Sequence, residues 1–181
     1  MRLRRIKFFG LCLGLLLAAG AVHAQSPRPS EYQLKAAFLY NFAKFIDWPP
    51  EVSGDDKASF VIGVLGDNPF GNNLEQIVSG KKINGRPIVV QALQSASAAS
   101  HCQILFISSS EKNRFTEILQ NLRGTAVLTV SDTDQFIESG GMVNFVPEAT
   151  KIRFEINNEA AKAARLKISS KLLSLAITPA H

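Results

Sequence analysis

The sequence predicts a single α/β domain of the Rossmann-like, doubly wound type, with a largely parallel sheet, helices on both faces and a C-terminal antiparallel hairpin. Three apolar runs, at 60–65, 103–107 and 126–130, each lead into a small polar segment and then a helical pattern. Such runs are typical of strands covered on both faces, and their alternation with helices favours parallel pairing. A later run, 151–156, alternates strictly between charged and apolar residues, which is typical of a half-exposed hairpin strand near a sheet edge.

The first 24 residues have the pattern of a cleaved signal peptide. Four basic residues precede an apolar run at 8–19, which is short for a bilayer span, and Val22-His23-Ala24 fits a small-residue cleavage site. We therefore expect a soluble mature chain that is exported and not membrane-embedded. It would begin with a polar lead-in at 25–30, followed by one domain at 31–177.

The composition of the mature chain excludes some classes of protein. The whole chain has 20 basic and 15 acidic residues and a formal net charge of +5, and four of the basic residues lie in the leader. The remaining balance of 16 against 15 gives no basic stripe, so we expect no nucleic-acid partner. Of the 181 residues, 157 follow the leader, which is enough for one domain with its own core.

One of the two cysteines, Cys12, lies in the leader, so Cys102 alone remains and an internal disulfide is excluded. A lone thiol at the start of an apolar strand is expected to be a small buried hydrophobe. The alternative is a redox-active or intermolecular thiol, which requires exposure and a lowered pKa.

The stretch at 31–50, EYQLKAAFLYNFAKFIDWPP, predicts a helix with a broad apolar face that ends at the proline pair. One interpretation is a plain core helix. The other is that the face is too wide for one domain, so that part of it meets a partner or a second copy. Aromatic enrichment makes the following residues a candidate interaction or dimer face: Phe38, Tyr40, Phe42, Phe45 and Trp48.

The strand at 60–65 runs into GDNPFG, where Asp67 or Asn68 is expected to cap a helix that carries Leu74, Ile77 and Val78. A turn at 81–86, a second strand at 87–93 and a Ser/Ala loop at 94–100 follow.

The strand at 103–107 leads to Ser108 and Glu111, which have capping-box spacing, and then to a helix as far as Leu122. The strand at 126–130 ends at Ser131-Asp132, and a short helix is expected through Phe136 and Ile137.

The polar residues that follow the strands share one edge of the predicted sheet. In open parallel sheets, ligands bind beyond the carboxyl ends of the strands. The candidate ligand rim consists of Asp67, Asn68, Ser108 and Ser131. The alternative is that these residues are helix caps and nothing more.

The C-terminal part is predicted to form a hairpin and two helical segments. Strands at 142–146 and 151–156 flank a turn at 147–150. Asn157 or Asn158 is expected to cap the next helix, and Ser169-Ser170 to interrupt it and cap a separate final helix.

The mature chain contains no zinc-protease, paired-cysteine, nucleophile-elbow or P-loop motif. Its two histidines, His101 and His181, do not lie among acids, so a serine triad has no plausible base. We expect no metal, no cofactor and no enzyme activity, and interpret the chain as an exported binding or regulatory module.

Seven stretches carry a resemblance to a known family. They are KAAFLYNFAKFIDWP at 35–49, GDNPFG at 66–71, GRPIVV at 85–90, CQILFI at 102–107, AVLTVSD at 126–132, GGMVNFV at 140–146, and IRFEIN with LKISSKLLSLA between 152 and 176. Each is ordinary alone, but their order and spacing together resemble the YfiR/HmsC family of periplasmic proteins.

The resemblance implies a dimer-forming α/β fold and a regulatory function. It implies inhibition of an inner-membrane diguanylate cyclase through the periplasmic sensory domain of that enzyme, with less cyclic di-GMP and less biofilm as the result. In the best-known member, an OmpA-like outer-membrane lipoprotein sequesters the inhibitor, so such a lipoprotein is a second expected partner. The alternative is a periplasmic small-ligand sensor that uses the candidate rim without a cyclase partner.

Two positions depart from the family pattern. The best-known relative pairs a cysteine with the position of Cys102, and here no partner exists, so redox sensing does not carry over. Relatives tend to have glycine where this chain has Arg165. Arg165 would therefore either straighten the helix or lie in a strained conformation.

Overall fold

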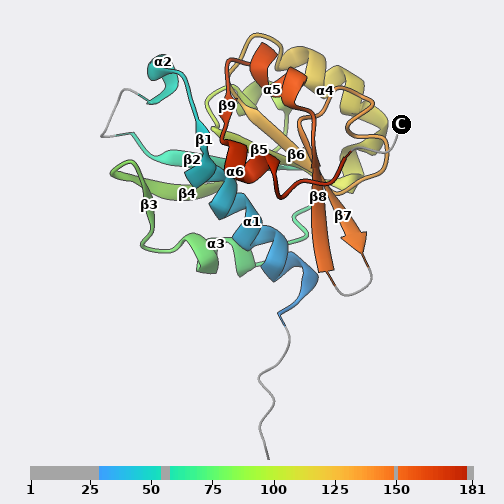
Figure 1. Ribbon diagram of the computed structural model, residues 1–181. Helices are drawn as coiled ribbons and strands as arrows, with labels where there is room; N and C mark the ends of the chain where they lie inside the picture. Colours follow the sequence, from blue (N-terminus) through green and yellow to red (C-terminus); the bar gives the residue numbers. More distant parts are fainter. Residues whose placement is uncertain (1–28, 54–57, 149–150, 179–181) are drawn as a thin grey trace, which may run out of the picture.

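The computed structural model describes residues 29–53, 58–148 and 151–178. In this part of the chain, seven strands form one sheet in the order β3-β4-β2-β5-β6-β7-β8, and β1 pairs with β9 (Figure 1). The strands are β1 Ile46–Asp47, β2 Phe60–Leu65, β3 Lys82–Ile83, β4 Arg86–Leu93, β5 Ile104–Ile107, β6 Leu128–Ser131, β7 Val143–Glu148, β8 Lys151–Ile156 and β9 Lys167–Ile168. The predicted signal peptide lies outside the described residues.

The helices lie between these strands in the chain. They are α1 Glu31–Phe45, α2 Pro50–Ser53, α3 Asn73–Val78, α4 Phe115–Asn121, α5 Asn158–Ala163 and α6 Ser170–Leu173, with 3-10 helices η1 Ala96–Ala99 and η2 Ser109–Arg114. One core cluster packs α1, α3 and α6 on one face of the sheet, and a second packs η1 and α4 on the other. The predicted α/β class with a largely parallel sheet is therefore confirmed.

The five central strands are parallel, and the order of the chain across the sheet reverses between β2 and β5. That part matches a doubly wound arrangement. Both edges depart from it, because β3 and β8 run antiparallel to their neighbours. At the C-terminal edge, the predicted hairpin pairs Phe145 with Phe154. At the other edge, Lys82–Ile83 forms a strand where the sequence predicted only a turn, and Asn84 and Gly85 connect it to β4 with φ of 50° and 82°.

The first helix is shorter than predicted. Ser30 and Gln33 form a capping box at its start, but it ends at Phe45 rather than at the proline pair. Ile46 is already extended (φ −122°, ψ 133°) because it pairs with Ile168 in β9. Strand pairing to a distant segment ends the helix before the prolines do.

Two other predictions near the rim need correction. The helix after β2 begins at Asn73, because Asn68 accepts a hydrogen bond from the Phe70 amide instead of capping a helix. The segment at 133–140 consists of turns and contains no helix. Gln135 has φ 68°, in the left-handed region, which interrupts a helix at that point.

The helical segments at the C-terminus break at Arg165. Asn157 caps α5 through the Ala160 amide at 3.0 Å, as predicted. Arg165 then has φ 61°, its amide donates to Lys162 O, and the Leu166 amide donates to Ala161 O. This is a Schellman ending with arginine at the position that favours glycine. The predicted separate final helix is confirmed, with Ser169 capping α6 through the Leu172 amide.

Cys102 is buried in the cluster between the sheet and η1, with 1% of its surface exposed. Burial raises the pKa of its thiol to about 11. A Cβ atom on Gly63 of the neighbouring strand would lie 2.9 Å from its sulfur, so the two residues are closely packed. Cys102 is therefore the small buried hydrophobe that the first interpretation predicted.

We expect Arg165→Gly to stabilise the protein by about 0.5–1 kcal/mol, because glycine adopts a positive φ without the steric cost that arginine bears. Lys162→Gly is the matched control. Lys162 lies in the helical part of α5, so this variant should lower the free energy of unfolding by about 1 kcal/mol. Urea unfolding monitored by circular dichroism gives both values. Equal destabilisation by the two glycines would contradict the strain at Arg165.

We also expect part of the stability to be lost in alkali through Cys102. Its folded pKa of about 11 lies above the ordinary value of 9.0, so this contribution is complete below pH 9 and disappears as the pH rises to 11. The loss is on the order of 2 kcal/mol. Denaturant titrations of the wild type and Cys102→Ala at pH 8 and pH 11 should show a smaller loss in the variant. Parallel pH profiles of the two proteins would be evidence against a buried neutral thiol.

Candidate functional site

The α1 helix crosses one face of the sheet between α3 and α6 (Figure 1). Its inward side is fully buried and contains Lys35, Ala36, Leu39, Phe42 and Ala43. Of its other aromatic residues, Phe38, Tyr40 and Phe45 are half-buried at the two borders of its outward side, and Tyr32 is half-buried in the first turn. The aromatic residues predicted as an interaction face are thus divided between the core and the surface.

Phe42 belongs to the core. It is 0% exposed, stacks on Phe145 with 5.8 Å between ring centroids, and meets Phe154 edge-on at 5.2 Å. Phe38 contacts the same two rings at 6.0 and 5.5 Å but keeps part of its surface exposed. Phe42 therefore positions α1, while Phe38 forms the border between the core and the outward side.

Three exposed lysines lie over the rings of Tyr40 and Phe45. Lys44 Nζ is 5.4 Å from the Tyr40 centroid and 5.9 Å from the Phe45 centroid. Lys81, just after α3, is 4.4 Å from Tyr40, and Lys171, from α6, is 5.4 Å from Phe45. None of the three forms an ion pair with an acid in the described part of the chain. We name these five residues the lysine–aromatic surface.

Trp48 lies beyond α1, at the amino ends of the parallel strands. Its indole Nε1 donates to Gln103 O at 3.2 Å, and its ring meets Phe60 edge-on at 5.2 Å. With Asp47 and Arg86 it lines a cavity of about 330 Å³. The guanidinium of Arg86 donates to three backbone carbonyls there, so it serves to hold the chain near residue 58.

At the candidate ligand rim, Asp67 and Asn68 lie in the exposed loop after β2. The Asp67 amide donates to Ser110 Oγ at 3.0 Å, and Asp67 is an exposed residue. The Asn68 side chain accepts from the Phe70 amide at 2.9 Å and donates to Gly71 O at 3.3 Å. The amide of Asn68 therefore organises its own loop.

The two serines of the rim are buried. Ser108, 3% exposed, accepts from the Ser110 amide, and Ser131, 0% exposed, donates to Ile107 O at 2.8 Å. Their hydroxyl groups thus bind backbone atoms next to the ends of β5 and β6. Both serines lie at the carboxyl edge of the sheet, as the sequence predicted, and both hydroxyl groups form hydrogen bonds within the protein.

A buried ionic cluster at the same edge was missed by the sequence analysis. Lys35 Nζ lies 2.6 Å from Asp132 Oδ2 and 2.5 Å from Glu31 Oε1, and the side chains of Lys35 and Asp132 are 3% and 6% exposed. The Tyr32 hydroxyl also donates to Asp132 Oδ2 at 3.0 Å. Burial, together with the negative charge of Asp132 and this hydrogen bond, raises the pKa of Tyr32 to about 12.

This cluster fixes the first turns of α1 onto the end of β6. The helical spacing of Glu31 and Lys35 was visible in the sequence, but Asp132 is 97 residues away from Lys35. Tyr32 also packs edge-on against Phe70 at 5.5 Å. A ligand at this part of the rim would have to displace the Tyr32 and Lys35 side chains, so α1 covers the β6 end of the rim.

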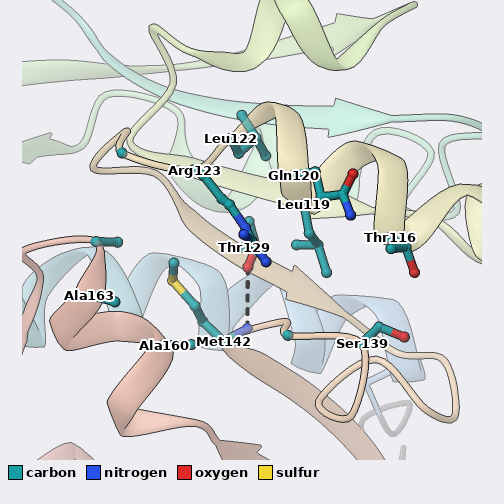
Figure 2. Close-up of a pocket in the computed structure, with 13 residues that line it drawn as sticks. Thr116, Leu119, Gln120, Leu122, Arg123, Thr129, Ser139, Met142, Ala160 and Ala163 are labelled. Atoms are coloured by element: carbon teal, nitrogen blue, oxygen red, sulfur yellow. Dashed lines mark hydrogen bonds between the residues drawn. The ribbon is translucent and has the colours of Figure 1, made fainter.

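The opposite side of the molecule contains a groove of about 480 Å³ between α4 and α5 (Figure 2). One wall comes from Leu119 of α4 and from Leu122 just after it, and the other from Ala160 and Ala163 of α5 and the following Ala164. Thr129 and Met142 lie between the two walls. The Thr129 hydroxyl accepts a hydrogen bond from the Met142 amide at 3.2 Å. The groove was not predicted, because it depends on how α4 and α5 are placed in three dimensions.

Within the described residues, no three His, Cys, Asp or Glu side chains are grouped so that they could hold a metal ion. A search of the same residues finds no helix long and apolar enough to cross a membrane.

The fold is similar to the crystal structure of a conserved domain protein from Vibrio cholerae, with a TM-score of 0.56 and 11% sequence identity. The match covers 82% of this chain and 60% of that one, so the chain spans only part of that protein's length. At this identity the similarity shows the fold alone.

No curated protein matches the sequence significantly. A family model described as YfiR/HmsC-like matches residues 32–177, from the second residue of α1 to beyond α6 in Figure 1. The match includes Tyr32, Lys35 and Asp132 of the ionic cluster, the lysine–aromatic surface and the groove. The chain therefore belongs to the YfiR/HmsC-like family of periplasmic regulators.

Proposed function

We propose that this protein inhibits an inner-membrane diguanylate cyclase by binding the periplasmic sensory domain of that enzyme, which lowers cyclic di-GMP and biofilm formation. Membership of the YfiR/HmsC-like family supports a periplasmic regulator. The signal-peptide pattern at 1–24 supports export to that compartment. In this function the protein is a binding module and not an enzyme.

The observation that carries the proposal is the lysine–aromatic surface on α1. Aromatic residues are enriched at protein interfaces, because they bury a large area with little loss of side-chain entropy. Tyr40 and Phe45 are half-buried here, with three exposed cations over their rings. A binding partner can cover these rings and pair with the lysines in one contact.

The outward side of α1 carries exposed polar residues, as a surface helix normally does, and partly exposed apolar residues beside them. The fully exposed residues of α1 are Glu31, Gln33 and Lys44, and the partly exposed ones on the same side include Leu34, Ala37 and Asn41. The alanine at position 37 leaves room for another protein to approach the helix, and Leu34 offers apolar surface beside it. Such a side favours a contact with a partner over permanent exposure to solvent.

The three unpaired lysines define the chemistry of the partner. A complementary surface on the sensory domain carries acidic side chains, which steer association and fix the orientation. An OmpA-like outer-membrane lipoprotein that relieves the inhibition would compete for the same surface. A homodimer is part of the proposal, and it leaves at least one lysine–aromatic surface accessible to the cyclase.

The binding test uses the mature chain, residues 25–181, and the periplasmic domains of the inner-membrane diguanylate cyclases of the same organism. We expect saturable binding by biolayer interferometry that weakens as the salt concentration rises. Lys44→Glu combined with Lys171→Glu should raise Kd by at least about tenfold, since two attractive charges become repulsive. Lys112→Glu, on exposed η2 beyond the other face of the sheet, is the matched control and should leave Kd unchanged.

Absence of binding to every such domain would exclude the proposed mechanism. An equal loss of affinity in the double lysine variant and in Lys112→Glu would show that net charge alone weakens binding. It would then contradict a contact at the lysine–aromatic surface.

The cellular test is deletion of the gene, followed by measurement of cyclic di-GMP and surface-attached biomass. We expect both to rise, because the inhibition of the cyclase is lost. Complementation with the whole chain should restore the lower values, whereas a chain that lacks residues 1–24 should not. Restoration by the form without the leader would contradict a periplasmic site of action.

A further inference from the structure

We propose that the groove between α4 and α5 binds an amphipathic carboxylate, with a straight apolar chain of about ten carbons lying in the groove and its carboxylate held by Arg123. The groove has a volume of about 480 Å³ and is lined by α4, the segment at 139–142 and α5 (Figure 2). A volume of this size lies within the range of small-molecule sites. The inference is independent of the proposed inhibition of a cyclase.

The groove exists because its walls carry small side chains. Ala160, Ala163 and Ala164 form the α5 side, and Gly124 and Gly140 lie at the ends of the adjoining turns. Both helices are short, with seven residues in α4 and six in α5, so neither extends over the space between them. A large side chain from α5 would occupy part of it.

The lining of the groove is mainly apolar. Leu119, Leu122 and Met142 provide aliphatic surface beside the alanines. Thr129, at its floor, has its hydroxyl group occupied by the Met142 amide at 3.2 Å and is only 1% exposed. A straight alkyl chain fits this surface, because its methylene groups gain free energy on burial and need no hydrogen-bond partner.

Arg123 supplies the single charge of the groove. Its side chain extends from the end of α4 over the floor toward Thr129 (Figure 2). Its guanidinium makes no hydrogen bond or ion pair with any side chain or carbonyl of the described residues, and no acid is found among the described residues that line the groove. A planar guanidinium binds a carboxylate through two parallel hydrogen bonds, which selects an anion over an alcohol or a cation.

The test is calorimetric titration of decanoate, below its micelle-forming concentration, into the mature chain. We expect saturable binding of one molecule per chain. 1-Decanol, which has the same chain without the charge, should bind at least about tenfold more weakly because it cannot pair with Arg123. Decyltrimethylammonium should bind more weakly still.

Two variants separate the roles of charge and space. Arg123→Gln should weaken decanoate about tenfold and leave 1-decanol unchanged, whereas Lys112→Gln, an exposed cation on η2, should change neither. Ala163→Leu should weaken binding of both probes, because the larger side chain occupies part of the groove. Ala163 is exposed, so the variant is expected to fold, and circular dichroism checks this. If Ala163→Leu does not fold, the comparison of Arg123→Gln with the wild type still tests the proposal.

Several results would overturn this assignment. One is the lack of saturable heat from decanoate up to millimolar concentration. Another is equal affinity of decanoate for the wild type, Arg123→Gln and Ala163→Leu. A third is a dimer in sedimentation equilibrium that Ala163→Leu dissociates, because the groove would then be an interface between two copies of this chain.

Discussion

The packing of two rings from the first helix against two rings from the last hairpin is the contact on which the architecture depends. Phe38 and Phe42 meet Phe145 and Phe154 with centroid separations between 5.2 and 6.0 Å. More than a hundred residues separate the two pairs in the chain, so the contact joins the first helix to the last strands of the sheet. Aromatic pairs in such offset and edge-on geometries contribute about 0.5–1.5 kcal/mol each beyond the burial of their area.

Two further contacts hold α1 at its ends, and together with the ring cluster they make it a rigid platform. The Lys35–Asp132 pair fixes the start, and pairing of Ile46 with Ile168 fixes the segment after its last turn. A buried pair of this kind is costly to break from one side, because the remaining charge stays buried without compensation. A helix held at three points loses little conformational entropy when a partner covers it, which favours binding through its outward side.

Much of the fold was predictable because the strands carry local signals. The continuous apolar run at 60–65 predicts a strand buried on both faces, and the strict alternation at 151–156 predicts a half-exposed strand. The structure has strands at both places. Local patterns failed where another feature determines the end of a helix. At Ile46 that feature is pairing with a distant strand, and at Gln135 it is a positive φ angle. The lysine–aromatic surface was predictable only in its α1 part. Lys81 and Lys171 reach it through the docking of α3 and α6, which no periodicity within α1 can show.

The lysine–aromatic surface lies on the α1 face of the sheet, whereas the groove lies between α4, which packs on the other face, and α5, which packs on the α1 face. Ala161 packs into the core cluster that contains α1, whereas Ala160 and Ala163 line the groove. The chain continues from α5 through Arg165 into β9, which pairs with the strand directly after α1. A ligand in the groove changes the affinity for a partner only to the extent that it binds the two states of the protein differently. Such a difference would reach α1 through the position of α5, because a shift of that short helix moves both the wall of the groove and the strand that ends α1.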